Sequence, residues 1–325
     1  MSEILTLAAN NLISPIILSF VLGVVAALAR SDLTIPEAVA KGMSIYLLFA
    51  IGFKGGAGVA DHGIDSTLVL TLLAGLVLSF MLPFLAFYLL KVLTPLGVID
   101  RAAVAAHYGS ISIVTFVAAT SVLEGQGIAS EGYMVAAAAV MEAPAILSAL
   151  WLVSRSDASA EPTKGLYREI LLNGSIVLLV GTFFIGMATG EEGMAKIAPF
   201  IVAPFQGVLC LFLLDMGLVA GRGLRQARGD LGGGAVLFGL IMPPLGSMIG
   251  LAAALLIGLS PGGAALMMTL AASASYIAVP AAMRVALPEA RPSIYLTLSL
   301  GVTFPFNLTV GIPLYTAVAT QFAGG

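Results

Sequence analysis

Residues 66–90 read STLVLTLLAGLVLSFMLPFLAFYLL, an apolar stretch of 25 residues that contains no charged side chain. A helix of about twenty residues crosses a hydrocarbon core of ~30 Å, so this stretch is long enough to span a membrane. Its apolar residues are continuous and do not alternate with polar ones, which favours a helix over a strand of an outer-membrane barrel. The stretch therefore predicts a transmembrane helix.

The rest of the chain has the same character. Hydrophobic residues make up 59% of the 325 residues and charged residues 10%, against roughly 45–50% and 25% in soluble domains. This composition, with a mean hydropathy of +1.07, excludes soluble enzymes, nucleic-acid-binding proteins and secreted scaffolds. The single cysteine, Cys210, excludes an internal disulfide framework and a cysteine-clustered metal site. We expect an all-α polytopic membrane protein.

Charges, prolines and glycine clusters divide the chain into ten apolar segments, each long enough to cross a bilayer. The first is kept as a mature span because the N-terminus lacks the basic region of a signal peptide. The predicted spans are 10–29, 35–53, 66–92, 101–124, 132–154, 167–188, 199–220, 231–258, 264–287 and 293–319.

The basic residues sort to one side of these ten spans. Only Lys54 and Lys196 fall on the other side. Because cytoplasmic loops carry the excess of Lys and Arg, the distribution predicts a multi-pass protein of a bacterial inner membrane with both termini outside the cytoplasm. The twelve residues on the cytoplasmic side are Arg30, Lys41, Lys91, Arg101, Arg155, Lys164, Arg168, Arg222, Arg225, Arg228, Arg284 and Arg291.

The two halves of the chain resemble each other. A polar linker at 154–166 separates residues 1–153 from residues 167–325, and a shift of 165 positions lays 48–58 over 213–223. Each half holds five spans, an odd number, so the second half would enter the membrane from the opposite side, as in the inverted repeats of secondary transporters. At the same offset Ser110 falls on Ser275, Glu124 on Glu289 and Glu142 on Asn307.

Spans four and nine contain sequences that weaken a helix. Residues 107–115 read HYGSISIVT and residues 272–280 read ASASYIAVP. Glycine, closely spaced serines and a proline after a β-branched residue all disfavour a continuous helix. A broken helix frees backbone groups that lipid cannot satisfy. Its half-helix N-termini suit a small anion, and its freed carbonyls and hydroxyls suit a cation such as sodium. Close helix packing by small residues is the alternative interpretation.

Two carboxylates lie deep within apolar spans. Glu142 precedes Pro144 in span five, and Asp215 lies within span seven. A charge at the bilayer centre costs several kcal/mol, so each carboxylate needs a partner, a proton or a cation. We interpret Glu142 as a sodium or proton site because its repeat mate is polar too, whereas Asp215 is equally compatible with a structural role.

Several segments resemble the sodium-dependent bicarbonate transporter family. They are 204–217 (PFQGVLCLFLLDMG), 274–280 (ASYIAVP), 311–315 (GIPLY) and 142–145 (EAPA). The resemblance runs over nearly the whole chain. It implies ten spans in two inverted halves, a fold like that of bile-acid sodium symporters, and a trimer that imports bicarbonate with sodium.

The resemblance also implies a division of the helices and a set of site residues. Helices 3–5 and 8–10 would form a mobile core in which the broken helices four and nine cross, and helices 1, 2, 6 and 7 would form the gate or scaffold. The expected substrate-binding residues are Gly109, Ser110, Ile111, Ser112, Ser273, Ala274, Ser275 and Tyr276. The expected sodium ligands are Ser112, Thr115, Glu142 and Asn307, with Asp215 as a weaker candidate.

The sequence thus favours a sodium-coupled secondary transporter for a small anion, with bicarbonate as the leading candidate. Another small organic or inorganic anion, or proton coupling through Glu142, remains open, as does a soluble cytoplasmic regulator. A receptor or structural protein is disfavoured because broken helices are costly without a ligand. An intramembrane enzyme is disfavoured because the chain has no nucleophile–base or metal cluster, and the lack of a phosphate-binding loop gives no sign of ATP coupling. No organic cofactor and no nucleic-acid partner are expected.

Overall fold

The computed structural model describes residues 13–62, 65–142, 144–156, 174–226 and 231–324. These residues form helices joined by short connections, and they contain no β-strand. The first twelve residues lie outside the described residues. So do residues 157–166 of the predicted linker and the first residues of predicted span six, 167–173. The helical fold expected from the composition is confirmed.

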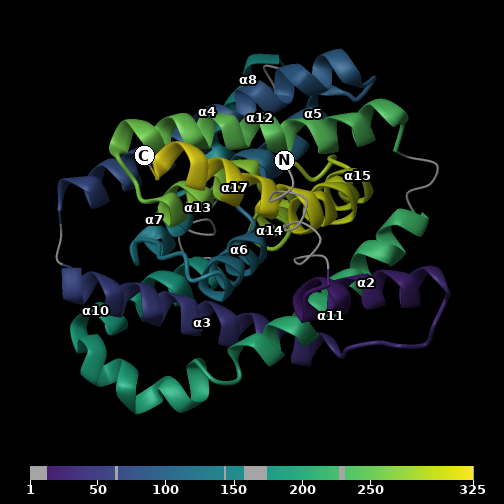
Figure 1. The fold of residues 1–325 in the computed structure, drawn as a ribbon. Coiled ribbons are helices and arrows are strands. Elements are labelled where there is room, and N and C mark those ends of the chain that lie inside the picture. The colour runs from purple at the N-terminus through teal and green to yellow at the C-terminus, as the bar shows by residue number, and fades with distance from the viewer. Residues whose placement is uncertain (1–12, 63–64, 143, 157–173, 227–230, 325) are drawn as a thin grey trace.

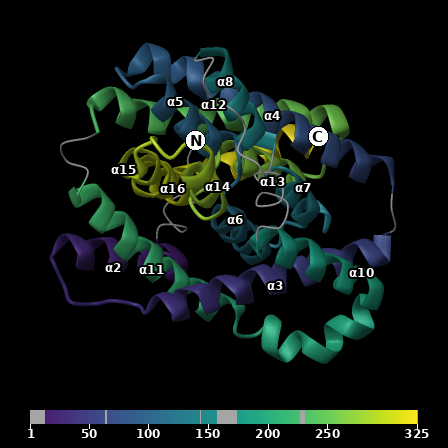
Figure 2. The same cartoon turned by 180° about the vertical axis from the view of Figure 1, so that it is seen from behind.

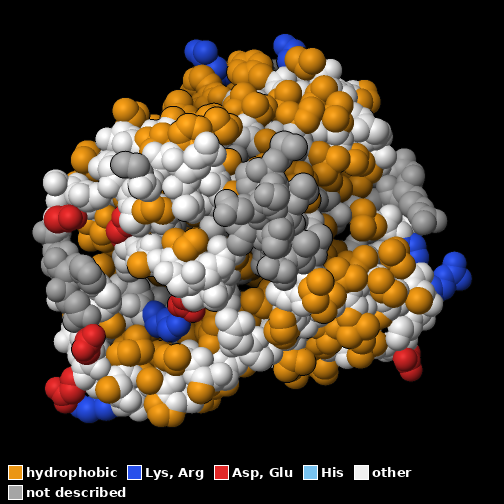
Figure 3. All heavy atoms as spheres, in the orientation of Figure 1, with side chains coloured by type: hydrophobic (Ala, Val, Ile, Leu, Met, Phe, Trp, Pro, Cys, Tyr) orange, Lys and Arg blue, Asp and Glu red, His pale blue; other side chains and the backbone are white. Residues whose placement is uncertain are grey.

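Eight helical segments are long and apolar enough to cross a membrane. They span Glu37–Ala60, Ser66–Leu93, Val98–Gly125, Met134–Arg155, Val177–Ile201, Phe205–Arg225, Gly233–Ile257 and Pro292–Ala323. Two shorter apolar helices overlap the other two predicted spans: Pro15–Leu28 lies within 10–29, and Pro261–Ala272 begins three residues before the predicted start at 264. The protein is therefore a multi-pass membrane protein, and large hydrophobic side chains cover much of its surface (Figure 3).

Figures 1 and 2 show the helices in chain order from purple to yellow. The first part of the chain forms α2 (Pro15–Leu28), α3 (Glu37–His62), α4 (Ser66–Leu93), α5 (Val98–Gly109), α6 (Ile113–Gly125), α7 (Met134–Val140) and α8 (Pro144–Ser156). The second part forms α10 (Gly174–Ile201), α11 (Phe205–Gln226), α12 (Gly233–Ile257), α13 (Pro261–Ala272), α14 (Ala278–Ala286), α15 (Pro292–Leu296), α16 (Phe304–Phe306) and α17 (Ile312–Ala323). Two π-helical turns, η2 (Thr297–Thr303) and η3 (Asn307–Gly311), interrupt the last span.

Several helix boundaries differ from those expected. Helix α3 continues to His62, well beyond the predicted end at 53, because its glycine-rich last turns pack closely against α10. Helix α10 runs past the predicted end at 188 and bends at Gly190, whose φ of 57° is in the left-handed region that glycine adopts freely. The sequence signals at these ends were loop-like, and packing against a neighbouring helix overrode them.

Two tightly packed helix pairs form one layer of the molecule, in which α2 lies along α11 and α3 lies along α10 (Figures 1 and 2). Glycines create both contacts. A Cβ atom on Gly56 of α3 would lie 1.8 Å from the carbonyl oxygen of Phe183, and one on Gly217 of α11 would lie 2.1 Å from that of Phe20. Small residues allow helix backbones to approach this closely in membranes.

The two pairs repeat the same spacing. On α3, Gly52 faces the Leu179 carbonyl and Gly56, four residues later, faces the carbonyl four residues after Leu179. On α11, Gly217 and Gly221 face the carbonyls of Phe20 and Val24, again four residues apart. Gly52 and Gly56 are the residues that the 165-residue offset lays over Gly217 and Gly221. Each half of the chain therefore supplies one glycine-bearing helix to a contact with the other half.

The remaining helices form a second body around the interrupted spans. Helices α4 and α12 pack against each other and against α5 and α13, respectively. Both helices are long and remain continuous although they contain prolines, Pro83 in α4 and Pro243 and Pro244 in α12. Figures 1 and 2 show α6, α13 and α14 lying between these long helices and the layer of α2, α3, α10 and α11. The interrupted spans are thus enclosed on both sides.

The glycine contacts generate a stability prediction. Gly56→Ala and Gly217→Ala should each lower the free energy of unfolding by about 1–3 kcal/mol or more, because the added methyl group would overlap a carbonyl oxygen of the facing backbone. Matched controls lie on the same helices. A Cβ atom on Gly42 or Gly207 would meet no atom within 4 Å, so alanine there should be neutral or slightly stabilising. Thermal unfolding of the four purified variants in detergent tests this, and equal melting temperatures within each pair would contradict it.

Candidate functional site

The fourth predicted span is interrupted at residues 110–112, as expected. Helix α5 ends at Gly109, and α6 begins at Ile113. Ser112 has extended backbone angles and caps α6, since its hydroxyl oxygen accepts the backbone N–H of Thr115 at 3.2 Å. Serine is a preferred residue at such a position because it satisfies one of the free N–H groups of a helix start. The expected half-helix N-terminus is therefore present in the described structure.

The ninth predicted span is interrupted at residues 273–277. Helix α13 ends at Ala272, and α14 begins at Ala278. Ser273 is extended, and its hydroxyl donates to the carbonyl oxygen of Leu270 at 2.9 Å. The hydroxyl oxygen of Ser275 accepts the backbone N–H of Val279 at 3.4 Å, a long capping contact. Both interruptions predicted from glycine, serine and proline are observed.

The two interruptions are joined by hydrogen bonds. The backbone N–H of Ser275 donates to the carbonyl oxygen of His107 at 2.7 Å, and the backbone N–H of Ser112 donates to the hydroxyl oxygen of Ser273 at 2.9 Å. All four residues are at most 3% exposed. Segments 161 to 168 residues apart therefore satisfy each other's backbone groups in the interior, where lipid cannot.

Glu142 lies at a third interruption, between α7 and α8. Ser79 of α4 stabilises this interruption from both sides. Its hydroxyl donates to the Met141 carbonyl at 2.6 Å and accepts the backbone N–H of Ala145 at 3.2 Å. A Cβ atom on Gly109 would lie 2.9 Å from the Cβ of Ala145. The segment that carries Glu142 thus packs directly against the end of α5.

Asn307 holds the end of α13. Its amide nitrogen donates to the carbonyl oxygen of Ala272 at 2.9 Å, and its amide oxygen accepts the hydroxyl group of Tyr315 at 2.9 Å. Ala272 directly precedes the second interruption. The structure therefore brings Asn307 to the interrupted region, where it stabilises a helix end through both halves of its amide group.

Unpaired polar atoms concentrate at the three interruptions. The described residues contain six buried side-chain nitrogen or oxygen atoms without a hydrogen-bond partner, and five belong to this region. Such atoms cost free energy in a protein interior unless a ligand, ion or water satisfies them. The region therefore has spare hydrogen-bonding and coordinating capacity. The five atoms are His107 Nε2, Ser110 Oγ, Thr115 Oγ1, Glu142 Oε2 and Tyr276 OH.

Further polar side chains fix this region, and the sequence reasoning did not single out Ser79, Tyr108 or Thr303. Tyr108 lies 2.6 Å from the Thr303 hydroxyl, which itself donates to the Gly239 carbonyl at 2.7 Å, so Tyr108 is the donor in the first contact. His107 donates through Nδ1 to the Ala103 carbonyl and stacks on the Tyr295 ring. The one sequence feature that could have identified Ser79 and Thr303 is a hydroxyl group within an otherwise apolar span.

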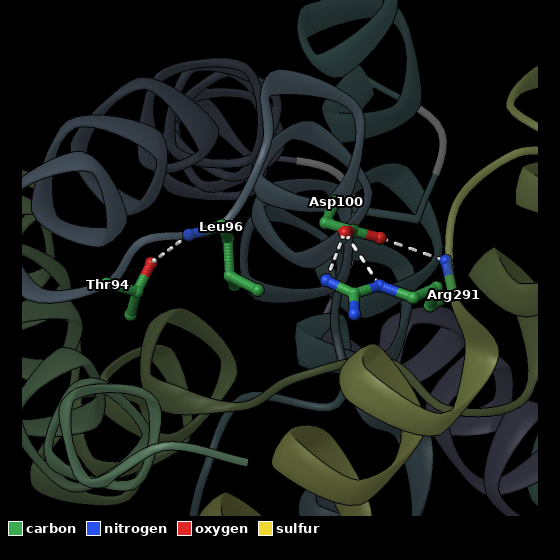
Figure 4. A network of polar contacts seen from close by, with 4 residues as sticks. All are labelled: Thr94, Leu96, Asp100 and Arg291. Carbon is green, nitrogen blue, oxygen red and sulfur yellow. Dashed lines mark hydrogen bonds and ion pairs between the residues drawn. The ribbon is translucent and has the colours of Figure 1, made fainter. Parts of the chain in front are cut away.

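An ion pair fixes the start of α5. Asp100, in the first turn of that helix, accepts the backbone N–H of Arg291 at 2.9 Å and two guanidinium N–H groups at 2.7 and 3.0 Å (Figure 4). Nearby, the Thr94 hydroxyl oxygen accepts the backbone N–H of Leu96 (Figure 4). Asp100 thereby ties the interrupted span four to the start of the last span.

Asp215 lies away from the interruptions. It is 7% exposed on α11, within the helix pair formed with α2, and the charge that acts on it is that of Arg222 on the same helix. No hydrogen bond or ion pair among the described residues links Asp215 to Ser112, Ser273 or Glu142. Of the carboxylates expected in the site, only Glu142 lies at an interruption.

Comparison with known proteins adds an independent finding. No curated protein matches the chain significantly. The family model of the Na+-dependent bicarbonate transporter superfamily matches residues 15–320, which include all three interruptions and both glycine-paired helix contacts. Members of this family are transport proteins and not enzymes. The chain belongs to the Na+-dependent bicarbonate transporter superfamily.

Proposed function

We propose that this protein imports a small anion together with sodium, and that the anion is bicarbonate, as the family description indicates. The observation that carries the proposal is the cluster of buried, unpaired polar atoms at three helix interruptions, two of which are hydrogen-bonded to each other. A site assembled from both halves of the chain is what alternating access requires of a secondary transporter.

The proposed anion site lies between the interruptions of spans four and nine. Backbone N–H groups at the start of α6 and serine hydroxyls offer hydrogen-bond donors, and the positive end of a half-helix favours negative charge. The unpaired Ser110 hydroxyl adds a donor without a protein acceptor, and the buried Tyr276 hydroxyl lies beside Ser112 at the same place. The residues assigned to this site remain Gly109, Ser110, Ile111, Ser112, Ser273, Ala274, Ser275 and Tyr276.

The proposed sodium site uses oxygen atoms, which hard cations prefer. Thr115 Oγ1 and Glu142 Oε2 are buried and unpaired, so they can coordinate an ion without breaking a protein hydrogen bond. Ser112 lies one turn from Thr115. The amide oxygen of Asn307 accepts one hydrogen bond and retains a second lone pair. Asp215 stays outside this proposed set because it lies on α11.

Coupling to sodium also follows from the charge of the substrate. An anion that enters a cell moves against an inside-negative potential, which costs ~2.3 kcal/mol per charge at 100 mV. One sodium ion moving with it cancels this cost, and the sodium gradient then drives accumulation. Proton coupling through Glu142 is the second candidate, and the observation in its favour is that the Glu142 carboxyl group has no cationic partner among the described residues.

We further propose that two inverted halves of five spans each build this transporter, with α2, α3, α10 and α11 as the scaffold or gate. The repeated glycine spacing at the α3–α10 and α2–α11 contacts supports this arrangement. The trimeric state remains a prediction from the family resemblance. The proposed location is a bacterial inner membrane with the linker in the cytoplasm.

The orientation can be tested by labelling in intact cells. After replacement of Cys210, a cysteine at Glu192 should react with an impermeant thiol reagent, whereas a cysteine at Ala160 in the linker should react only after the cells are lysed. The expectation rests on the sorting of basic residues, with Lys196 near Glu192 and Lys164 in the linker. Labelling of position 160 in intact cells would overturn the orientation.

The anion site can be tested by filling it. Ser275→Leu should abolish uptake of radiolabelled bicarbonate into proteoliposomes, because a bulky side chain would occupy the space between the interruptions. Ser154→Leu, at an exposed position of α8, is the matched control and should retain uptake.

A second variant separates binding from folding. Ser110→Ala removes a hydroxyl group that has no partner in the protein, so the melting temperature should stay the same or rise. The KM for the anion should nevertheless rise by about five- to tenfold, as expected for the loss of one hydrogen bond to a charged ligand. Uptake unchanged in both Ser275→Leu and Ser110→Ala would remove these residues from the site.

The coupling ion can be identified from the sodium dependence of uptake at several fixed pH values. Glu142→Gln should raise the sodium KM roughly tenfold or more, since a charged ligand contributes about 1.5–3 kcal/mol, and Thr115→Val should raise it less. Glu191→Gln, at an exposed position of α10, should have no effect. A wild-type rate that ignores sodium but follows the proton gradient would favour proton coupling instead.

A further inference from the structure

Three arginines line a surface pocket that shares no residue with the interruptions at spans four, five and nine. The pocket has a volume of about 390 Å³ and is lined by Ala27, Arg30 and Ser31 at the end of α2 and by Arg222 and Arg225 on α11. The two segments are some 190 residues apart in the chain and are brought together by the α2–α11 pair. All three arginines belong to the group that the charge distribution assigns to the cytoplasmic side.

Backbone carbonyls hold two of these guanidinium groups in place. Arg222 donates through Nη2 to the Leu33 carbonyl at 3.0 Å, and Arg225 donates through Nη1 to the Ala27 carbonyl at 3.2 Å. Each group keeps several further N–H donors. None of the three arginines forms an ion pair with the residues that the structure describes. The pocket thus gathers three positive charges, and two of the guanidinium groups are partly fixed by their hydrogen bonds.

Arg30 occupies a position that normally belongs to glycine. Helix α2 ends in a Schellman motif, in which the N–H of Ser31 donates to the Ala26 carbonyl and the N–H of Arg30 to the Ala27 carbonyl. In this motif the residue directly after the helix cap adopts left-handed backbone angles, and here that residue is Arg30, with a φ of 61°. It is the one residue other than glycine with a positive φ in the described part of the chain. A strained position filled by a long cationic side chain points to a function for that side chain.

The pocket adjoins an apolar surface. Helix α2 exposes a row of large hydrophobic side chains that leads to the pocket, and α11 adds Leu211 and Val219. Figure 3 shows hydrophobic side chains gathered over this part of the molecule, with Lys or Arg side chains at the edge. The exposed residues of α2 are Leu18, Val21, Leu22, Val25 and Leu28.

We propose that this pocket binds the phosphate headgroup of an anionic lipid whose acyl chains lie along α2 and α11. Guanidinium groups recognise phosphate oxygens through paired N–H donors. Basic pockets between transmembrane helices on the cytoplasmic side are suited to such headgroups. The apolar row beside the pocket favours a lipid over a soluble phosphate compound, because it gives the acyl chains a surface to cover.

The decisive variant is Arg30→Gly, because it removes the charge and supplies the residue that the backbone angles favour. The purified full-length protein in detergent would be titrated with phosphatidylglycerol, phosphatidylcholine and inorganic phosphate, and bound lipid would be counted by native mass spectrometry. Wild type should bind phosphatidylglycerol saturably and well above phosphatidylcholine. Arg30→Gly should bind phosphatidylglycerol about tenfold more weakly, with a lipid-free melting temperature that is unchanged or higher.

The control is Lys41→Gln, which removes an exposed basic residue predicted to lie on the same side but outside the pocket. It should bind phosphatidylglycerol as wild type does. Equal binding by wild type and Arg30→Gly, or an equal loss in Lys41→Gln, would overturn the proposal. Inorganic phosphate that binds as tightly as phosphatidylglycerol would overturn the assignment to a lipid and indicate a soluble phosphate ligand.

Discussion

The hydrogen bonds between the two helix interruptions are the interaction on which the rest of the structure depends. A helix that breaks in the middle of a membrane exposes N–H and C=O groups that lipid cannot satisfy. Here the N–H of Ser275 is satisfied by the His107 carbonyl, and the N–H of Ser112 by the Ser273 hydroxyl. Each break is therefore tolerable only in the presence of the other. The surrounding helices must hold the two segments together, and this requirement explains the long, uninterrupted α4 and α12 beside them.

Two different kinds of packing follow from this requirement. The α2–α11 and α3–α10 pairs are held by close van der Waals contact between backbones at glycines. This kind of contact does not depend on side-chain hydrogen bonds. The interrupted spans are held by side-chain hydrogen bonds to carbonyl groups, as at Ser79, Asn307 and Thr303. Polar contacts between the two bodies are few among the described residues. They include the Lys54–Glu124 ion pair and the hydrogen bond from Gln206 to Ser121. Such a division is compatible with movement of one body against the other.

The sequence predicted the parts of the fold that local chemistry determines. Long apolar runs indicated the membrane helices, and the serine-rich strings at 107–115 and 272–280 indicated the interruptions. Helix partners could not be predicted, because a glycine does not reveal which carbonyl will face it. The π-helical turns of the last span were missed for a similar reason, since they depend on how that span packs around its prolines. The Arg30 conformation was missed because arginine gives no sign of left-handed angles.

The comparison of Glu142 with Asn307 shows how one position can acquire two roles. The 165-residue offset in the sequence lays one over the other, and both lie buried beside an interruption. Asn307 is neutral, and both ends of its amide group are hydrogen-bonded, so it can hold the end of α13 permanently. Glu142 keeps an unpaired carboxylate oxygen at 3% exposure. A carboxylate in that setting is stable only with a cation or a proton. The 165-residue offset thus pairs a neutral amide group, both ends of which are hydrogen-bonded, with a carboxyl group that keeps one oxygen unpaired.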